Sequence, residues 1–341
     1  MKTLLVGEFG YGTLGLSYFN ALKKLGCDIF QFDLMEEYKT LNPLVRNKYA
    51  ARVLGNLLYK KVNERLLDIV SLYKPEIVFI IKGALIFPDT LRKIKEKINP
   101  LILNFNPDNP FNINRGASNN LIRKSIPIYD CYFTWGKFLI PELKKVGAKQ
   151  VEYLPFAYDQ KLHYPLTISE EEKNIYGSDV AFIGSWDKER EEWLQNLSDY
   201  DLAIWGNAWG KLKHGSQLKK KWKGREVVGE DFSKVCNASK IVLNLIRKQN
   251  GNAHNMRTFE VPACQGFMLT TRTEEQCRLF TEDREIACFG TPEELKMKID
   301  YYLSQDELRS NISSNAYKKV KAHTYFERAK QILEFFEVYK T

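Results

Sequence analysis

The sequence predicts an α/β protein made of two nucleotide-fold-like halves, and three observations support this prediction. Short apolar runs alternate with helical patterns along the chain, which indicates parallel sheets covered by helices. The alternation stops after residue 157 and restarts near residue 178. A length of 341 residues with 44% hydrophobic content is enough for two cores of ordinary domain size.

The predicted first domain covers residues 1–157. Its expected strands are apolar without strict alternation, as is typical of strands buried on both faces; they are Lys2–Gly7, Cys27–Leu34, Glu76–Ile81, Leu101–Phe105 and Cys131–Thr134. The segments between them place apolar residues at helical spacing; the expected helices are Leu14–Leu25, roughly Lys48–Tyr73 and Asp89–Ile98.

Residues 158–177 have little apolar periodicity, so we interpret them as a linker to a second domain at 178–322. The expected strands of that domain are Asp179–Gly184, Asp201–Trp205, Ile241–Leu245 and Phe267–Thr271, with a helix at Asp187–Leu197. Capping-box patterns at Thr291 and Ser304 predict the starts of two later helices. Residues 323–341 form a terminal helical segment.

Composition and charge narrow the class of protein. Lys and Arg exceed Asp and Glu by 51 − 42 = 9, which favours anionic partners: nucleotide phosphates, nucleic acid or an acidic membrane surface. The six cysteines form no C-x-x-C pair, so we expect reduced thiols in a cytoplasmic protein. Scattered His and Cys indicate no metal site. No stretch resembles a signal peptide or the roughly 20 apolar residues that cross a bilayer.

The segment Lys211–Arg225 contains seven cationic residues and no acid, with Trp209 and Trp222 nearby. Such a segment can bind nucleic acid or acidic lipid headgroups. The alternative, which we favour, is a solvated loop.

Gly10-Tyr11-Gly12-Thr13-Leu14-Gly15 matches G-x-G-x-x-G, with Asp33 at the end of the second expected strand. The pattern suggests a dinucleotide site. Its register argues against one, because Glu8 and Phe9 separate the strand from the first glycine. We favour a loop that lets a ligand approach the backbone, built from Glu8, Gly10, Tyr11 and Gly12, with a plain tight turn as the alternative.

Asn106–Phe111 follows directly on an expected strand, where open α/β sheets bind ligands. Asp108 in this Asn/Asp/Pro cluster is a candidate for accepting a proton or binding a sugar hydroxyl. An Asx-Pro turn that has no role in binding or catalysis explains the pattern equally well.

In the second domain, the turn after the first strand can bind an anion through backbone amides and a guanidinium; its candidates are Gly184, Ser185, Trp186 and Arg190. A Gly/Asn-rich loop then leads into a short helix that ends at Gly266. Donors there suit a diphosphate, and a carboxylate one turn later suits the ribose hydroxyls; these candidates are Asn252, His254, Asn255, Met256, Arg257 and Glu260. An ordinary solvated Glu and a structural His are the alternatives.

An ordered set of motifs resembles the CgeB-type glycosyltransferases. In the second half these are Asp179–Ser185 with Arg190, Ile204–Gly206 with Trp209, Ile241–Asn244, Arg257–Glu260, Ala263–Gly266 and His323–Tyr325 with Arg328; in the first half they are Asn106–Phe111 and Leu154–Asp159. The resemblance covers most of the chain, and its strength lies in the order of the set.

The resemblance implies a GT-B architecture: two Rossmann-like domains facing across a cleft, with the C-terminal helix crossing back to the first. A nucleoside-diphosphate sugar would bind mainly to the second domain and a saccharide-type acceptor mainly to the first. Relatives usually need no metal or other cofactor, because helix-terminal amides and basic side chains neutralise the leaving diphosphate.

One motif departs from the wider retaining group, whose members carry two acids spaced E-x7-E. Glu260 matches the second acid, but Asn252 stands at the first, so the stereochemical outcome stays open. Arg257, Glu260 and Asp108 are the catalytic candidates. If the reaction inverts, Asp108 or Glu8 is the candidate base.

Two other functions remain open at this stage. One is a nucleotide-sugar epimerase or hydrolase on the same architecture. The other is a non-catalytic protein that binds a nucleotide or a polyanion. We expect no nucleic acid as partner, whereas a peripheral membrane contact through the basic surface is compatible with the charge.

Overall fold

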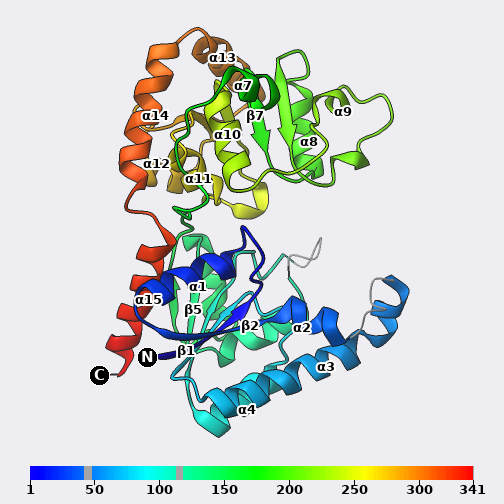
Figure 1. The fold of residues 1–341 in the computed structure, drawn as a ribbon, viewed down its shortest axis with the longest axis vertical. Helices are drawn as coiled ribbons and strands as arrows, with labels where there is room; N and C mark the ends of the chain where they lie inside the picture. Colours follow the sequence, from blue (N-terminus) through cyan, green and yellow to red (C-terminus); the bar gives the residue numbers. More distant parts are fainter. Residues whose placement is uncertain (42–47, 113–117, 341) are drawn as a thin grey trace. The chain divides into compact units, whose positions relative to one another are not determined.

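In the computed structural model, which describes residues 1–41, 48–112 and 118–340, the chain forms two compact units (Figure 1). The first unit comprises Met1–Pro155 and Tyr325–Thr341, and the second comprises Phe156–Thr324. Residue 341, the last of the expected terminal segment, lies outside the described residues.

The first unit is built on a six-stranded parallel sheet with the order β2-β1-β3-β4-β5-β6. Its strands are β1 (Lys2–Gly7), β2 (Asp28–Asp33), β3 (Ile77–Ile81), β4 (Leu101–Phe105), β5 (Cys131–Thr134) and β6 (Val151–Tyr153). Leu4 of β1 pairs with Phe30 on one side and with Val78 on the other. The central strands β3 and β4 are buried throughout, which explains their continuous apolar sequence.

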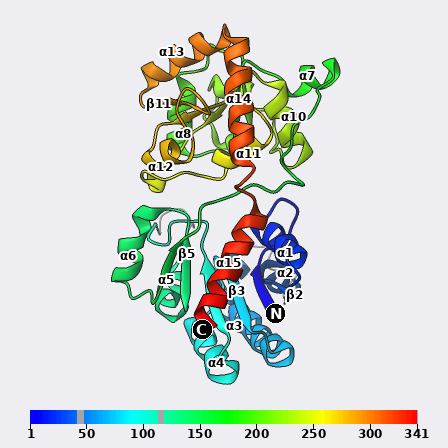
Figure 2. The same cartoon turned by 90° about the vertical axis from the view of Figure 1, so that its left-hand side faces the viewer.

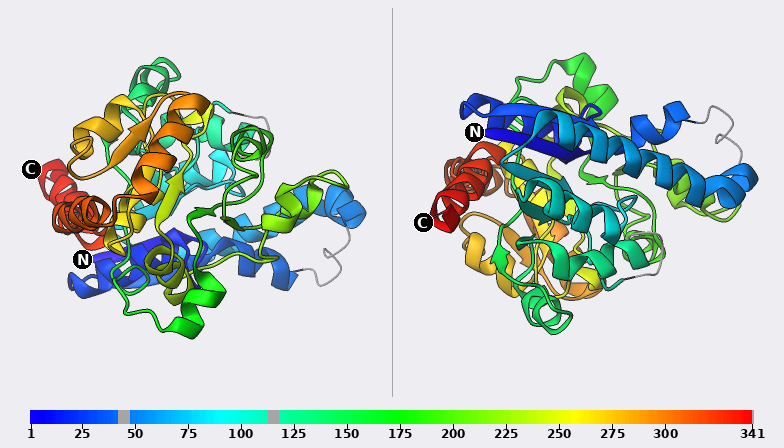
Figure 3. Two further views of the ribbon diagram at one scale, coloured as in Figure 1. Left: turned by 90° about the horizontal axis from the view of Figure 1, so that it is seen from above. Right: turned by 90° about the horizontal axis from the view of Figure 1, so that it is seen from below.

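At least one helix follows each of the strands β1 to β5. They are α1 (Leu14–Lys24), α2 (Leu34–Leu41), α3 (Lys48–Tyr73), α4 (Pro88–Ile98), α5 (Asn120–Ser125) and α6 (Ile140–Lys145), with short 3₁₀ turns at Ile126–Ile128 and Lys137–Leu139. Figure 3 shows the long helix α3 beside α4, and the two helices contact each other.

The last helix, α15 (Tyr325–Lys340), belongs to the first unit, as the resemblance implies. It lies against α1 (Figure 2), where the rings of Tyr18 and Tyr325 are 5.2 Å apart. Arg328 Nε donates to the Pro155 carbonyl at 2.9 Å. The return of the chain to the first unit is thus fixed by both apolar and polar contacts.

The second unit is built on a five-stranded parallel sheet with the order β11-β10-β9-β7-β8. Its strands are β7 (Val180–Ile183), β8 (Leu202–Trp205), β9 (Ile241–Asn244), β10 (Met268–Thr271) and β11 (Ala287–Phe289). Its helices are α7 (Glu170–Tyr176), α8 (Lys188–Gln195), α9 (Leu218–Lys221), α10 (Glu230–Ala238), α11 (Arg257–Ala263), α12 (Glu274–Leu279), α13 (Pro292–Leu303) and α14 (Asp306–Val320). Short 3₁₀ turns lie at Trp209–Lys211 and Lys248–Asn250.

The core of this unit confirms the expected burial of both sheet faces. On one face Phe182 of β7 pairs with Ile204 and Leu243, and on the other face Ala181 pairs with Ala203 and Val242; all six side chains are buried. With two such units, the α/β fold of two Rossmann-like domains is confirmed. The cleft between them that the resemblance implies stays a prediction.

The expected linker at 158–177 is wrong, because this segment is part of the second unit. It contains α7, which opens with a full capping box between Ser169 and Glu172. The Leu166 amide donates to Asn237 Oδ1 at 2.7 Å and so ties the segment to α10. The observed boundaries, Pro155 and Tyr325, lie within two residues of those expected on either side.

The two expected capping boxes are only partly present. Thr291 caps α13 and Pro292 is its first residue, but the Glu294 carboxylate accepts from the Gly290 amide instead of closing the box. Ser304 does not open α14. It ends α13 and donates its hydroxyl to the Tyr301 carbonyl, so that prediction is wrong.

Within the described residues, each helix is too short or too polar to cross a bilayer.

Candidate functional site

The strand order of the second unit indicates where a ligand binds. The chain passes from β7 to β8 on one side and then returns to β9 on the other side of β7. Open α/β sheets bind ligands outside the carboxyl ends of the strands at such a reversal. The candidate site therefore lies around Gly184, which follows β7, and the segment that follows Asn244 of β9.

Gly184 and Gly206 allow two turns to approach each other closely. A Cβ on Gly206 would lie 2.0 Å from the Gly184 carbonyl oxygen. The Gly184 amide donates to the Trp205 carbonyl at 2.8 Å, and the Gly184 carbonyl accepts from Trp209 Nε1 at 2.8 Å. The Gly184 amide is thus used by the fold and is not the free anion donor that we expected. The Ser185 amide makes no hydrogen bond within the described part of the chain.

Trp186 is half-buried, and its polar atoms are also used by the fold. Its amide donates to the Asn207 carbonyl at 2.8 Å, and its Nε1 donates to Glu191 Oε2 at 2.9 Å. The Lys211 ammonium lies 5.4 Å from its ring centroid. Because its Nε1 is engaged, the Trp186 side chain can contact a ligand only through the ring.

Arg190 extends from α8 back to the turn, as we expected from its position in the sequence. Its Nη1 donates to the Ser185 carbonyl at 2.8 Å, and its Nε lies 3.6 Å from Asp187 Oδ2. The buried Nε has no hydrogen-bond partner within the described residues. Burial, followed by repulsion from Arg247, lowers the pKa of Arg190 to about 10. The side chain is therefore cationic at neutral pH in surroundings that disfavour its charge.

Two more guanidinium groups lie in the same region. Arg247 follows β9, and its Nη1 lies 3.7 Å from Asp187 Oδ2. Arg257 begins α11, and its Nε donates to the Ile183 carbonyl at 3.2 Å. Both groups lower the pKa of Arg190 by repulsion. We call Arg190, Arg247 and Arg257 the guanidinium cluster; such planar forks suit the oxygen atoms of a diphosphate.

Glu260 holds Arg257 in place. Its carboxylate is buried and forms an ion pair with Arg257 Nη1, while the guanidinium carbon lies 4.9 Å from the Phe232 ring centroid. Glu260 Oε1 lies 3.8 Å from His163 Nε2. Burial lowers the pKa of His163, so the ring is neutral at pH 7. The contact of Glu260 with a ribose stays a prediction.

The start of α11 is partly capped by its own chain. The Asn255 amide donates to Thr258 Oγ1, and the Thr258 amide donates to Asn255 Oδ1, both at 3.3 Å. Among the described residues, the Met256 and Arg257 amides have no acceptor. The positive helix end that the sequence predicts is therefore limited to these two amides.

His254 does not face a ligand. Its ring is completely buried, where Nε2 accepts from the Phe156 amide at 3.1 Å and Nδ1 lies 2.8 Å from Glu275 Oε2. Both ring nitrogens are used inside the unit, so the expectation of a diphosphate donor is wrong and His254 positions the loop instead. Asn252 is exposed, and its carbonyl accepts from the Glu275 amide at 3.1 Å.

Sequence reasoning missed Arg247 and His163. Arg247 stands two residues after an expected strand. Its position at the carboxyl end of that strand could have indicated a ligand-binding residue. His163 lies in the supposed linker, and no pattern in the sequence connects it with Glu260.

The glycine loop of the first unit is solvent-accessible. Glu8, Gly10 and Tyr11 are exposed, and Gly12 has a φ of 79° that favours glycine. The Thr13 hydroxyl donates to the Glu8 carbonyl at 2.9 Å and caps α1. The loop can therefore present backbone to a ligand, but the ligand contact itself stays a prediction.

Asp33 does not serve a dinucleotide. Its Oδ2 accepts from the Phe9 amide at 3.1 Å, and its Oδ1 accepts from the Met35 and Glu36 amides, both at 2.9 Å. These bonds fix the glycine loop to the start of α2. Both carboxylate oxygens therefore already accept hydrogen bonds from the backbone, whereas a dinucleotide site would use this carboxylate to bind the ribose. This agrees with the rejection of a dinucleotide site.

Asp108 lies at the carboxyl edge of β4 and is paired with a cation. Its Oδ2 lies 2.7 Å from Lys82 Nζ, and its amide donates to Asn106 Oδ1 at 3.0 Å. The Asx turn that we considered is therefore present. The partly exposed carboxylate still qualifies as a candidate base, with Lys82 as its neighbour.

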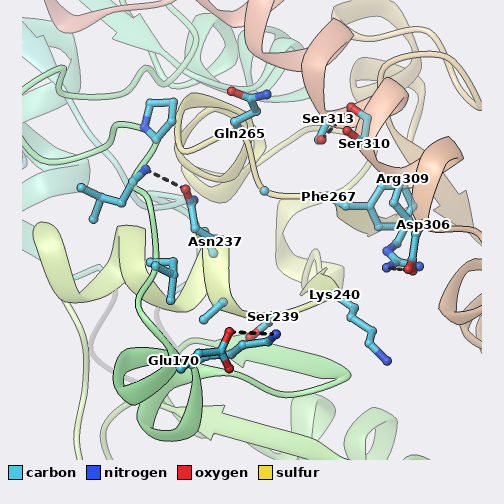
Figure 4. Close-up of a pocket in the computed structure, with 17 residues that line it drawn as sticks. Glu170, Asn237, Ser239, Lys240, Gln265, Phe267, Asp306, Arg309, Ser310 and Ser313 are labelled. Carbon is cyan, nitrogen blue, oxygen red and sulfur yellow. Dashed lines mark hydrogen bonds and ion pairs between the residues drawn. The ribbon is translucent and has the colours of Figure 1, made fainter.

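A pocket of about 600 Å³ in the second unit lies at the opposite edge of the sheet (Figure 4). Ser239 and Lys240 precede β9, and Phe267 precedes β10, so the pocket faces the amino ends of the strands. Arg309 of α14 lies on one side, where it pairs with Asp306. The pocket is therefore separate from the guanidinium cluster, which lies at the carboxyl ends of the strands.

Comparisons with known proteins find a sequence similarity in the second half of the chain. Residues 188–334 match the family model described as Glycosyl transferase-like. The matched segment begins with α8 and includes all three members of the guanidinium cluster. No curated protein matches the sequence significantly.

Several solved structures share the fold over nearly the whole chain. Sucrose-phosphate synthase of Thermosynechococcus elongatus has a TM-score of 0.70 at 11% identity, covering 99% of this chain and 98% of its own. A glycosyltransferase of Rickettsia africae has a TM-score of 0.63 at 15% identity, covering 98% and 97%. HepE of Anabaena, solved with UDP-glucose, has a TM-score of 0.66 at 10% identity, covering 99% and 100%.

At these identities the likeness shows the fold, which is the GT-B type expected from the sequence. Residues 188–334 are thus similar in sequence to glycosyltransferases, and nearly the whole chain is similar to them in fold.

Proposed function

We propose that this protein transfers a sugar from a nucleoside-diphosphate sugar to an acceptor, with the diphosphate bound at the guanidinium cluster. One observation carries the proposal: Arg190 is half-buried beside two other guanidinium groups, its Nε is fully buried, and its pKa is lowered to about 10. A bound dianion reverses this unfavourable arrangement, because each repulsive contact then gains an attractive partner. HepE of Anabaena, which shares the fold, binds UDP-glucose, and this supports a nucleoside diphosphate as the ligand class.

The same arrangement explains how the residues promote the reaction. Breaking the sugar–phosphate bond leaves additional negative charge on the diphosphate and an oxocarbenium-like sugar. Fixed guanidinium groups stabilise that separated charge more than the ground state. Glu260 holds Arg257 in position, so the cluster does not have to reorganise as the charge develops.

We propose that the transfer is metal-independent, since the cluster itself supplies cationic charge at the phosphates. Continued product formation in the presence of a chelator supports this, whereas complete loss that Mg²⁺ or Mn²⁺ restores contradicts it. Asp108 or Glu8 serves as the base if the reaction inverts, and each is partly or fully exposed at a carboxyl-end loop of the first unit.

The finer assignments are proposals of the same kind. The ordered motifs support a CgeB-like family, a hexosyl or deoxyhexosyl group as the one transferred, and a glycan, lipid-linked saccharide, protein or small molecule as acceptor. We also propose a cytoplasmic location with peripheral membrane contact. Exposed lysines of the Lys211–Arg225 segment support that contact; they are Lys211, Lys213, Lys219, Lys220 and Lys223. Co-sedimentation with acidic but not neutral vesicles tests it.

A thermal-shift panel of UDP, GDP, dTDP, ADP and CMP tests the binding step. We expect one nucleoside diphosphate to stabilise the protein by about 2.7 kcal/mol at 100 times its Kd. The stabilisation should weaken in Glu260→Ala, where Arg257 loses its partner. Arg278→Gln is the matched control, because Arg278 is an exposed arginine paired only with a neighbour on α12. No stabilisation by any of these nucleotides contradicts the proposal.

Product analysis then separates the transferase from its alternatives. The nucleotide sugar that corresponds to the stabilising nucleotide is incubated with and without candidate acceptors, and the products are identified by mass spectrometry. A conjugate that forms only with acceptor supports transfer. A free sugar or an isomerised nucleotide sugar, independent of acceptor, supports a hydrolase or an epimerase instead.

A further inference from the structure

Two cysteines and a glutamate come together at the edge of the second unit. Cys277 lies on α12, Glu282 in the turn that follows, and Cys288 on the edge strand β11. Their sulfur and carboxylate oxygen atoms all lie within 4.8 Å of one another. All six cysteines of the chain are free thiols, and these two are brought together by the fold rather than by sequence spacing.

The burial of the three side chains differs in a way that suits a metal ion. Cys288 is completely buried, Glu282 is half-buried and Cys277 is exposed. The cluster is therefore anchored in the core on one side and open to solvent on the other. A cation can enter from the open side and keep a water molecule as a further ligand.

The carboxylate is already oriented by a neighbouring guanidinium. Arg272 donates through Nη2 to Glu282 Oε1 at 2.7 Å and through Nε to Glu282 Oε2 at 3.0 Å. Arg272 is fixed in turn by Glu294 and by the Cys288 carbonyl, which accepts from Nη2 at 3.3 Å. Outer partners of this kind orient the ligands of metal sites and adjust their affinity.

We propose that Cys277, Cys288 and Glu282 bind a divalent cation of the zinc class. Two thiolates and one carboxylate form the mixed sulfur and oxygen set that zinc accepts, and water completes a tetrahedron. On binding, each thiol loses its proton to the buffer and forms one metal–sulfur bond, so two protons are released for each ion bound. The charges of the two thiolates then neutralise the dication, and the positive charge of Arg272 neutralises the Glu282 carboxylate.

The site stands apart from the proposed transferase chemistry. It shares no residue with the guanidinium cluster, and it joins α12 to β11 rather than contacting the phosphates. We infer that the metal fastens the edge strand to the preceding helix and stabilises the second unit. The inference therefore holds or fails independently of the proposed function.

Titration of the full-length, reduced, metal-free protein with Co²⁺ tests the site. We expect one ion per chain, with the visible absorption of tetrahedral coordination and the charge-transfer absorption of a cobalt–thiolate bond. Zn²⁺ should displace Co²⁺, abolish the colour and raise the melting temperature. Octahedral spectra without thiolate absorption, or the absence of binding, overturn the inference.

Variants assign the ligands. Cys277→Ser should weaken Zn²⁺ binding at least about 10-fold, and this exposed substitution is not expected to disturb folding. Glu282→Gln should also weaken binding about 10-fold. The matched controls, Cys27→Ser in the first unit and Glu285→Gln in the same turn as Glu282, should bind like the parent. Unchanged affinity in Cys277→Ser overturns the inference, as does a Cys277–Cys288 disulfide that persists under mild reduction and prevents metal uptake.

Discussion

Arg190 is held in surroundings that disfavour its own charge. Its guanidinium is half-buried and lies beside the other members of the guanidinium cluster. Its paired carboxylate is Asp187, at the start of its own helix. Such an arrangement is costly without a bound anion, and groups with perturbed pKa values cluster at functional sites.

Replacing Arg190 tests that interpretation at a single side chain. Arg190→Lys keeps the positive charge but loses the planar fork, so the affinity for the stabilising nucleoside diphosphate should fall about 10- to 100-fold. Titration calorimetry measures the change, with Arg278→Gln as the control. Equal affinities in Arg190→Lys and the parent would show that the phosphates do not contact this residue.

His163 gives the second unit a pH-dependent stability with a defined sign. Burial lowers its pKa in the folded state, so below about pH 6.5 the unfolded chain binds the proton first. The stability that the neutral ring provides is present above that pH and is lost as the pH falls. His163→Gln should therefore flatten the decrease of the melting temperature between pH 7 and pH 5.

The matched control for this measurement is His214→Gln, because His214 is exposed in the basic segment. The control should follow the parent over the whole pH range. If both variants show the parent's slope, His163 does not contribute to acid sensitivity.

At the scale of single elements, α7 shows what the sequence reasoning overlooked. The pattern Ser169-x-x-Glu172 is a capping box and was visible in the sequence, but the lack of apolar periodicity in residues 158–177 favoured a linker. The helix is held by polar contacts instead. Tyr176 donates its hydroxyl to Asp231 at 2.7 Å, and Lys234 lies 3.0 Å from Glu172.

Removing the cap tests whether α7 stabilises the second unit. Ser169→Ala should cost about 1 kcal/mol of unfolding free energy, because the Glu172 amide loses its acceptor. The melting temperature should fall by roughly 2–4 °C in a unit of this size. Ser198→Ala, in a turn after α8, is the control. A melting temperature unchanged in Ser169→Ala would indicate that α7 frays without affecting the unit.

Across the whole molecule, the fold could be predicted because the alternation of apolar strands and amphipathic helices extends along the chain. Two of the four edge strands were the exception. β6 and β11 have three residues each, too few to register as apolar runs. The order of strands is set by long-range packing that no local pattern encodes.

The candidate site was predictable in its position rather than in its contacts. Arg190 and Arg257 were found because each stands beside a turn at a strand or helix end. The burial of His254, the pairing of Arg257 with Glu260, and the approach of Cys277 to Cys288 depend on which elements become neighbours. Such contacts are set by the packing of whole elements, so spacing alone could not reveal them.

Hydrogen exchange tests the placement of the ligand on the scale of the molecule. The stabilising nucleoside diphosphate should slow exchange in peptides that contain residues 183–190 and 245–258, which surround the guanidinium cluster. Peptides from α4 in the first unit serve as the internal reference and should not change. Protection of the amino-end pocket at Lys240 and Arg309 instead would place the nucleotide at the other edge of the sheet.

The return of α15 to the first unit affects how the protein is made. A ribosome completes the sheet of that unit before it reaches the second unit, yet the helix that covers Tyr18 is translated only after the second unit. Domains generally fold as their residues emerge. The apolar face that α15 covers in the first unit must therefore stay exposed on the nascent chain until the second unit and α15 have been translated. Chaperone binding should be strongest during this interval.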